Sequence, residues 1–113
     1  MKKAYFLTVD TETTQDNLVA DFGATITDKK GNIVAQIAVL VDGIFTDYEN
    51  HPLFFTSDKT GLWARRGLDK RYAAYNKKIE SGDRMIASVA AINRWLTKAR
   101  LTYPNIILTA YNL

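Results

Sequence analysis

The sequence contains no cysteine, and this absence excludes several classes of protein. Without cysteine there is no disulfide framework, no thiolate metal site and no thiol nucleophile. A chain without disulfides suits a reducing compartment, so we expect a cytoplasmic location. Histidine is nearly as scarce, because His51 is the only one in 113 residues. It lies in the predicted loop "YENHPLFF", and we interpret it as a loop or packing residue and not as a catalytic base.

Long apolar runs are also missing, and no stretch approaches the length of a membrane span. The chain starts with "MKKAYFLTVD". Its apolar stretch is too short for a signal peptide, because Asp10 interrupts it. We therefore interpret residues 1–10 as a first strand and expect no membrane partner. Internal repeats, low-complexity tracts and linkers are absent. A single domain over residues 1–113 with one modest core is the expectation.

Acidic residues are scarce in one part of the chain, and basic residues are scarce in the rest. Residues 59–100 contain eleven of the fifteen Lys and Arg residues and only three acids, whereas the remainder holds nine acids and four lysines. A basic part beside an acidic part suits a protein that holds a polyanion at one surface and cations at another. Solvated helix faces give the same pattern, and charge alone favours this simpler interpretation.

The first part of the chain has the composition of β-strands. Aromatic and β-branched residues predict strands at residues 4–10, 18–27 and 33–41. The polar turn "DKKGN" at residues 28–32 predicts an antiparallel hairpin between the second and third strands. Residues 42–60 are predicted to be mostly loop.

Helical periodicity begins at about Thr60. It predicts one helix that starts near residue 63 and is broken by Ser81 and Gly82, and a second over residues 84–103 that Pro104 ends. The second helix has an apolar stripe formed by Met85, Val89, Ile92, Leu96 and Ala99. The final run at residues 105–111 predicts a strand that follows a helical crossover. Such a strand should lie parallel to an earlier one, with both faces covered. The expected fold class is α/β with a mixed sheet.

The stretch "YFLTVDTETT" at residues 5–14 carries the strongest functional signal. Asp10 and Glu12 lie at the end of the predicted strand on the same face, while Thr11 points to the opposite face. Adjacent carboxylates repel each other, and a hard divalent cation such as Mg²⁺ or Mn²⁺ compensates their charge. Two such ions about 3.5–4 Å apart can promote phosphodiester cleavage. Two solvated acids at a strand end would have the same spacing, so spacing alone leaves both interpretations open.

The motif "TVDTETT" resembles the first motif of the DnaQ-like (DEDD) 3′–5′ exonucleases, in which D-x-E stands on the first strand and Thr usually follows. The segment "DFGATITDKKGNIVAQIAVLV" is similar to the family's second and third strands, and "LTAYNL" is similar to the start of its second motif. The likeness is closest to phage-type exonucleases and extends from Tyr5 to Leu113. It implies a ribonuclease H-like fold, with three antiparallel strands, then helices, then a parallel strand.

The resemblance also implies a metal-dependent 3′–5′ exonuclease activity and a set of site residues. Asp10 and Glu12 would be the catalytic residues and the metal ligands, and Glu12 could bridge two Mg²⁺ or Mn²⁺ ions. The 3′ end of single-stranded DNA or RNA would be the nucleic acid partner, with Thr13 near the terminal nucleotide. The implied substrate-binding residues are Thr11, Thr13, Thr14 and Asn112.

In the resembled family, a third metal-binding Asp follows the Asn of the second motif, and a third motif supplies a fourth acid and a His or Tyr. These positions would fall beyond Leu113. We therefore expect the chain to be the N-terminal portion of an exonuclease domain, truncated, with weak or no activity alone. An incomplete sheet exposes apolar surface, which favours a homodimer.

Two alternative functions remain open from the sequence. One is a catalytically inactive nucleic-acid-binding or interaction module on the same scaffold, and the other is a different ribonuclease H-like enzyme, such as an endonuclease. The segment "GLWARRGLDKRYAAYNKK" bears on binding, because aromatic and basic residues alternate in sequence-tolerant single-strand binders. We favour the simpler interpretation, in which Trp63, Tyr72 and Tyr75 face the core and the basic residues face water.

Overall fold

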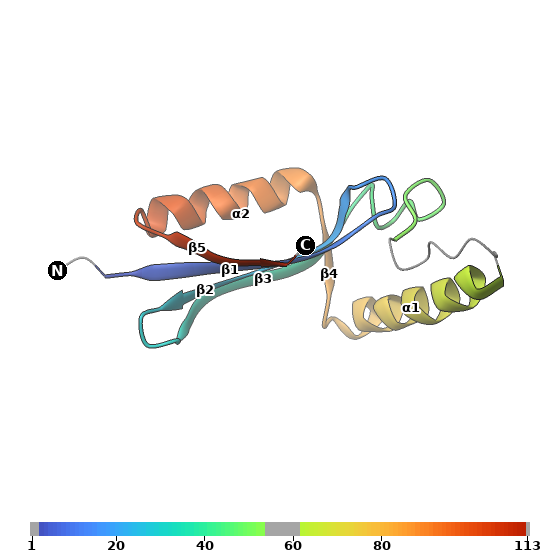
Figure 1. Cartoon of the computed structure of the whole chain (residues 1–113), viewed down its shortest axis with the longest axis horizontal. Helices are drawn as coiled ribbons and strands as arrows, with labels where there is room; N and C mark the ends of the chain where they lie inside the picture. The colour runs from blue at the N-terminus through green and yellow to red at the C-terminus, as the bar shows by residue number, and fades with distance from the viewer. Residues whose placement is uncertain (1–2, 54–61, 113) are drawn as a thin grey trace.

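The computed structural model describes residues 3–53 and 62–112, and it describes side chains for residues 3–53 and 72–109. The strands form one mixed sheet in the order β4-β3-β2-β1-β5. Helix α2 lies along one face of this sheet, and α1 lies at the end where β1 finishes (Figure 1). Neither helix, over the part of the chain described, is long and apolar enough to cross a bilayer. The elements are β1 (Tyr5–Thr13), β2 (Val19–Asp28), β3 (Ile33–Val41), α1 (Leu62–Ser81), β4 (Met85–Ala87), α2 (Val89–Thr102) and β5 (Ile107–Asn112).

Strands β1, β2 and β3 form an antiparallel meander, which confirms the predicted hairpin. The turn between β2 and β3 is built on Asp28, whose Oδ1 accepts the backbone N–H groups of Lys30 and Asn32, both at 2.9 Å. Gly31 adopts a φ of 88°, a conformation that favours glycine. Local turn chemistry therefore sets where the two strands begin to pair, and an irregularity between Ile26 and Thr27 then shifts their register by one residue.

β1 is longer than the sequence predicted. It continues past Asp10 to Thr13, because the β-branched Thr11 and Thr13 extend the pairing with β2. Asp10 and Glu12 therefore lie within the strand and not at its end. Their Cα partners across the sheet are Gly23 and Asp21.

The predicted helix over residues 84–103 begins later than expected. Met85–Ala87 instead form β4, which pairs parallel with the end of β3. Ser88 then caps α2 by accepting a hydrogen bond from the Ala91 N–H at 3.1 Å, so the helix starts at Val89. Met85 and Val89 are exposed. Only the later part of the predicted stripe faces the sheet, at Ile92, Leu96 and Ala99.

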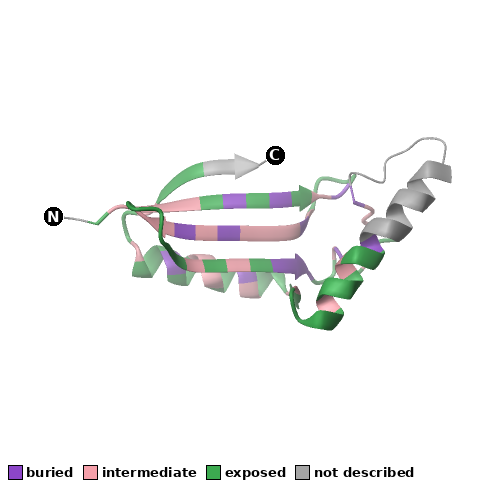
Figure 2. Cartoon of the chain, turned by 90° about the horizontal axis from the view of Figure 1, so that it is seen from below, coloured by how far each residue is buried: buried purple, intermediate pink, exposed green. Residues whose placement is uncertain are grey.

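Apolar residues are buried on both faces of the sheet. On one face, Ile92 of α2 packs against Val39 and Val41 of β3. On the other face, Tyr72 of α1 packs in a group that contains Ala20, Leu40, Phe45 and Leu53. This second group lies at the end of the sheet, so most of that face is not covered by a helix, and we call it the open face (Figure 1). Buried and exposed positions alternate along β1, as Figure 2 shows.

β5 pairs parallel with β1 after the helical crossover, as predicted. The expectation that both its faces are covered is wrong, because Ile107 and Leu108 are 50% and 59% exposed. β5 is an edge strand, and within the residues described here it has no neighbour on its outer side. Ile107 and Leu108 therefore add half-exposed apolar surface at this edge of the sheet.

Candidate functional site

Asp10 and Glu12 lie side by side on the open face of β1, and both side chains are exposed. Thr11, between them, is buried, which confirms the predicted alternation. The two carboxylates line a pocket of about 220 Å³, together with residues from β2, α1 and the segment after α1. We call it the acidic pocket; its lining residues are Asp10, Thr11, Glu12, Asp21, Gly23, Ala38, Tyr75 and Arg84.

Small residues form part of the lining of the acidic pocket. Gly23 is the Cα partner of Asp10 on β2, and Ala38 is the partner of Gly23 on β3. A Cβ added at Gly23 would meet only the carbonyl oxygens of Asp10 and Ile37, at 3.6 and 3.9 Å. Crowding of the backbone therefore does not require a glycine at this position. Its effect is to leave space beside the carboxylate that a longer side chain would fill.

Asp21 is a third carboxylate in this pocket, and it was not among the predicted site residues. A β-bulge lies between the pairs Glu12–Asp21 and Thr13–Val19, so Ala20 is the extra residue. Ala20 is buried in the core group next to α1, and Asp21 contacts a residue of the same helix. The signal available in the sequence was a single acid inside the otherwise apolar run "LVADFGAT".

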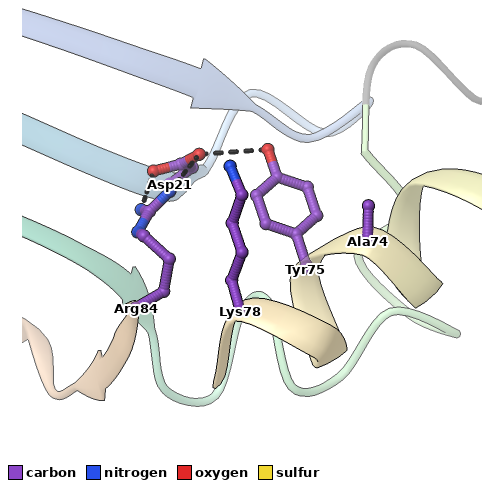
Figure 3. Close-up of a pocket in the computed structure, with 5 residues that line it drawn as sticks. All are labelled: Asp21, Ala74, Tyr75, Lys78 and Arg84. Atoms are coloured by element: carbon purple, nitrogen blue, oxygen red, sulfur yellow. Dashed lines mark hydrogen bonds and ion pairs between the residues drawn. The ribbon is translucent and has the colours of Figure 1, made fainter. Parts of the chain in front are cut away.

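The Asp21 carboxylate is held by Arg84 and Tyr75 (Figure 3). Nη2 of Arg84 forms an ion pair with Oδ1, and Nη1 donates to Oδ2 at 3.4 Å. The Tyr75 hydroxyl donates to Oδ2 at 3.0 Å. The Arg84 and Asp21 side chains are only 16% and 17% exposed. Burial, followed by the charge of Asp21, raises the pKa of the Tyr75 hydroxyl well above its usual range, so this group remains a donor at neutral pH.

A second pocket, of about 280 Å³, adjoins the first (Figure 3). Its lining includes Lys78 and Ala74 of α1, and it shares Asp21, Tyr75 and Arg84 with the acidic pocket. We call it the basic pocket. Lys78 extends from α1 toward Asp21 and Tyr75, as the close-up shows. The two pockets are therefore neighbouring compartments separated by the Asp21, Arg84 and Tyr75 side chains.

The two compartments differ in formal charge. Three carboxylates and one guanidinium line the acidic pocket, whereas one carboxylate, one guanidinium and one ammonium line the basic pocket. Arg84 neutralises Asp21, so Asp10 and Glu12 supply the excess negative charge of the acidic pocket. In the described part of the chain, no three His, Cys, Asp or Glu side chains converge as a metal site. Two carboxylates on one face of a strand can bind one divalent cation that keeps several of its water ligands.

The other predicted site residues on β1 and β5 lie around the acidic pocket. Thr11 contributes to the wall of the pocket, although its side chain is buried. Thr13 is half-buried and pairs with Val19 beyond the bulge. Asn112 is the Cα partner of Asp10 across β1 and β5, so its backbone is adjacent to the first carboxylate. The Asn112 side chain lies outside the described part of the structure.

Thr14 has a different position from the one that the resemblance implies. It is fully buried, its hydroxyl donates to Oδ1 of Asp16 at 2.5 Å, and it accepts the Leu18 N–H at 2.9 Å. Its side chain therefore stabilises the turn after β1 and is not exposed to a substrate. Nδ1 of His51 contacts the other oxygen of Asp16 at 2.7 Å. These hydrogen bonds, with that of Thr14 the largest cause, lower the pKa of Asp16.

The aromatic and basic segment is described from Tyr72 onward. Tyr72 is buried and accepts the Leu53 N–H at 3.2 Å, and Tyr75 is half-buried against the same core group. Lys77 and Lys78 are exposed. For these residues the interpretation with aromatic side chains inward and basic side chains outward is confirmed. The remaining residues of this prediction, Trp63, Arg65, Arg66, Lys70 and Arg71, have side chains outside the described part of the structure.

Comparison with known proteins adds no relative: the chain matches no protein family, no curated protein and no solved structure. The function of the two pockets is therefore inferred from their own residues, together with the resemblance of the D-x-E motif.

Proposed function

We propose that this chain carries the first two metal ligands of a divalent-cation-dependent 3′–5′ exonuclease that acts on single-stranded nucleic acid. The observation that supports the proposal most directly is the position of Asp10 and Glu12. Both are exposed on one face of β1, both line the acidic pocket, and β1 lies beside the parallel strand β5. Carboxylate pairs on the open face of a strand are suited to bind a hard cation.

The strand arrangement supports the same proposal. The three antiparallel strands β1, β2 and β3 are followed by a helical crossover on one face and by β5, parallel to β1. This order agrees with the one that a ribonuclease H-like fold implies, except that β4 lies between the two helices and pairs with the edge of β3. It also brings the Y-N pair of the resembled second motif next to the D-x-E motif, because Asn112 and Asp10 are register partners.

In the proposed activity, Asp10 and Glu12 would hold Mg²⁺ or Mn²⁺. The bound cation would supply an activated water and would stabilise negative charge on the phosphate. The protein's own contribution is to hold the carboxylate oxygens on a rigid strand and to leave space beside them at Gly23. Arg84 neutralises Asp21, so the third carboxylate does not add to the repulsion between the first two.

A nucleic-acid-binding module without catalysis is the second candidate. The ion pair of Arg84 with Asp21 favours it, because a built-in cation already compensates one of the three carboxylates. Outside this ion pair, the described lining of the acidic pocket contributes only Asp10 and Glu12 as acids. A second metal ion would need ligands from elsewhere.

A nuclease assay with a matched metal-binding assay tests the proposal. With Mn²⁺ and a 5′-labelled single strand, we expect stepwise loss of 3′ nucleotides at a low rate. We expect Mn²⁺ binding, measured by calorimetry, to be lost in Asp10→Asn and Glu12→Gln. Glu49→Gln is the control, because it removes an exposed carboxylate away from the pocket.

Each alternative gives a different result. Internal cuts would indicate an endonuclease. Oligonucleotide binding without hydrolysis, together with Mn²⁺ affinity unchanged in Asp10→Asn, would support the binding module and contradict the exonuclease proposal.

A further inference from the structure

The basic pocket contains two cationic side chains whose positions are fixed by the end of α1. Gly82 adopts a φ of 83°, and its N–H donates to the Ile79 carbonyl at 3.1 Å. The chain then reverses, and the Arg84 N–H donates to the Lys78 carbonyl at 3.1 Å. A residue with positive φ after a helix is a usual way to end it, and glycine adopts that conformation without strain. This reversal brings Lys78 and Arg84 together although six positions separate them.

Both side chains point to the same place. Figure 3 shows the Lys78 ammonium and the Arg84 guanidinium approaching the Asp21 carboxylate from the same side of the pocket. Asp21 carries one negative charge and the two side chains carry two positive charges. The basic pocket therefore has an excess of one positive charge, next to an acidic pocket of the opposite sign.

The donors of the two side chains are not all used. A guanidinium has five N–H groups, and the contacts with Asp21 involve only Nη1 and Nη2. Nε of Arg84 is buried, and within the described residues it has no hydrogen-bond partner. Lys78 forms no ion pair with any residue that the structure describes, and its side chain is exposed. A ligand with several anionic oxygens would satisfy such a set of donors.

A phosphate group is the ligand that matches these donors. Guanidinium groups bind phosphate oxygens through paired N–H groups, and lysine adds a point charge. The neighbouring acidic pocket suits a divalent cation, so a phosphate at the boundary would have cationic groups on both sides. Nucleic acids supply such phosphates in series, and single strands are bound mainly through backbone charge and aromatic stacking.

We propose that Lys78 and Arg84 form a phosphate subsite for single-stranded nucleic acid, adjacent to the carboxylates of Asp10 and Glu12. This inference rests on the proposed function for the choice of substrate. Phosphate binding at the subsite itself requires no metal ion and no hydrolysis. The subsite can therefore be tested separately from the reaction.

The test is fluorescence anisotropy with a labelled oligothymidine in the presence of EDTA. Lys78→Ala should raise the Kd about tenfold, because one charge-assisted contact is lost. It should also reduce the slope of log K against log salt by about 0.7, the value for one phosphate contact on a single strand. Lys77→Ala is the matched control, because Lys77 is exposed on the same helical turn and lines neither pocket. We expect its Kd and salt slope to equal those of the unmodified chain.

A second variant tests the geometry. Arg84→Lys keeps the charge and loses the planar guanidinium, so it should weaken binding although the net charge is unchanged. Circular dichroism establishes that each variant is folded before binding is compared. Lys78 is exposed, so Lys78→Ala is expected to fold normally.

The outcomes separate this inference from the proposed function. Equal affinities for Lys77→Ala and Lys78→Ala would overturn the subsite, whether or not the chain hydrolyses DNA. A selective effect of Lys78→Ala without Mn²⁺ binding at Asp10 would support the subsite and contradict the exonuclease proposal. Inorganic phosphate is the competitor in a third arm. If it displaces the oligonucleotide at equal phosphate concentration, the pocket binds small phosphate anions and the assignment to nucleic acid is wrong.

Discussion

Arg84 forms an ion pair with Asp21, 63 residues earlier in the chain, and Asp21 is the register partner of Glu12. The segment after α1 is thereby joined to the strand that faces one of the candidate metal ligands. The pair is mostly shielded from water, so its charges interact more strongly than they would on the surface. This contact forms part of the boundary between the acidic pocket and the basic pocket.

The first prediction concerns the stability that this ion pair provides. Arg84→Met leaves the largely buried Asp21 carboxylate without its cation, so the free energy of unfolding should fall by about 2–3 kcal/mol. Urea denaturation measures it. In a double-mutant cycle with Asp21→Asn, we expect a coupling energy of about 1–3 kcal/mol. A coupling energy near zero would mean that the two side chains do not stabilise each other.

The second prediction concerns Tyr75, whose hydroxyl donates to Asp21 at 3.0 Å. Burial and the Asp21 charge raise the pKa of Tyr75 above its ordinary value of 10.0. The folded chain then holds this proton more tightly than the unfolded chain. The resulting stability is complete below about pH 10 and is lost as pH rises through the folded-state pKa. Tyr75→Phe should therefore make the loss of stability at alkaline pH less steep. Tyr48→Phe, which removes an exposed hydroxyl, is the control.

Most of the fold follows from local patterns in the sequence. The hairpin at Asp28–Asn32 and the crossover to β5 are determined by turn residues, periodicity and chain connectivity, and all three are visible in sequence. The predicted start of α2 was wrong. "RMIAS" has the apolar spacing of a helix, but pairing with the edge of β3 makes Met85–Ala87 a strand. Propensity over three residues is weak, and tertiary pairing overrides it.

The site was predictable only in part, for a similar reason. The common direction of Asp10 and Glu12 follows from the strand period of two, which holds wherever a strand is regular. Asp21 was missed because it lies beside Glu12 only through the pairing of β1 with β2, and this register cannot be read from the period of either strand alone. The position of Arg84 depends on the chain reversal after Gly82, and the periodicity of strands and helices does not predict such a reversal.

The third prediction concerns the turn that follows β1. Hydrogen bonds from Thr14 and His51 lower the pKa of Asp16 below its ordinary value of 3.8. The unfolded chain binds this proton more readily, so the stabilisation is complete above about pH 4. It is lost as pH falls through the folded-state pKa. Asp16→Asn should therefore unfold with a shallower dependence on pH below about pH 4, measured by urea denaturation. Glu49→Gln, on the neighbouring loop, should retain the steeper dependence of the unmodified chain.

The fourth prediction concerns self-association through the edge of the sheet at β5. Edge strands present unpaired backbone groups, and β5 adds the half-exposed Ile107 and Leu108 at such an edge. In a symmetric dimer, each of the two subunits would contribute both residues to the interface. One substitution would therefore introduce a charge at two positions. We expect a dimer at high concentration, and Leu108→Lys should raise its dissociation constant at least about tenfold. Light scattering over a concentration series measures this.

Met85→Lys places the same charge on β4, at the opposite edge, and should leave the dimer intact. A monomer at every concentration would contradict the expectation, and disruption by Met85→Lys alone would move the interface to β4.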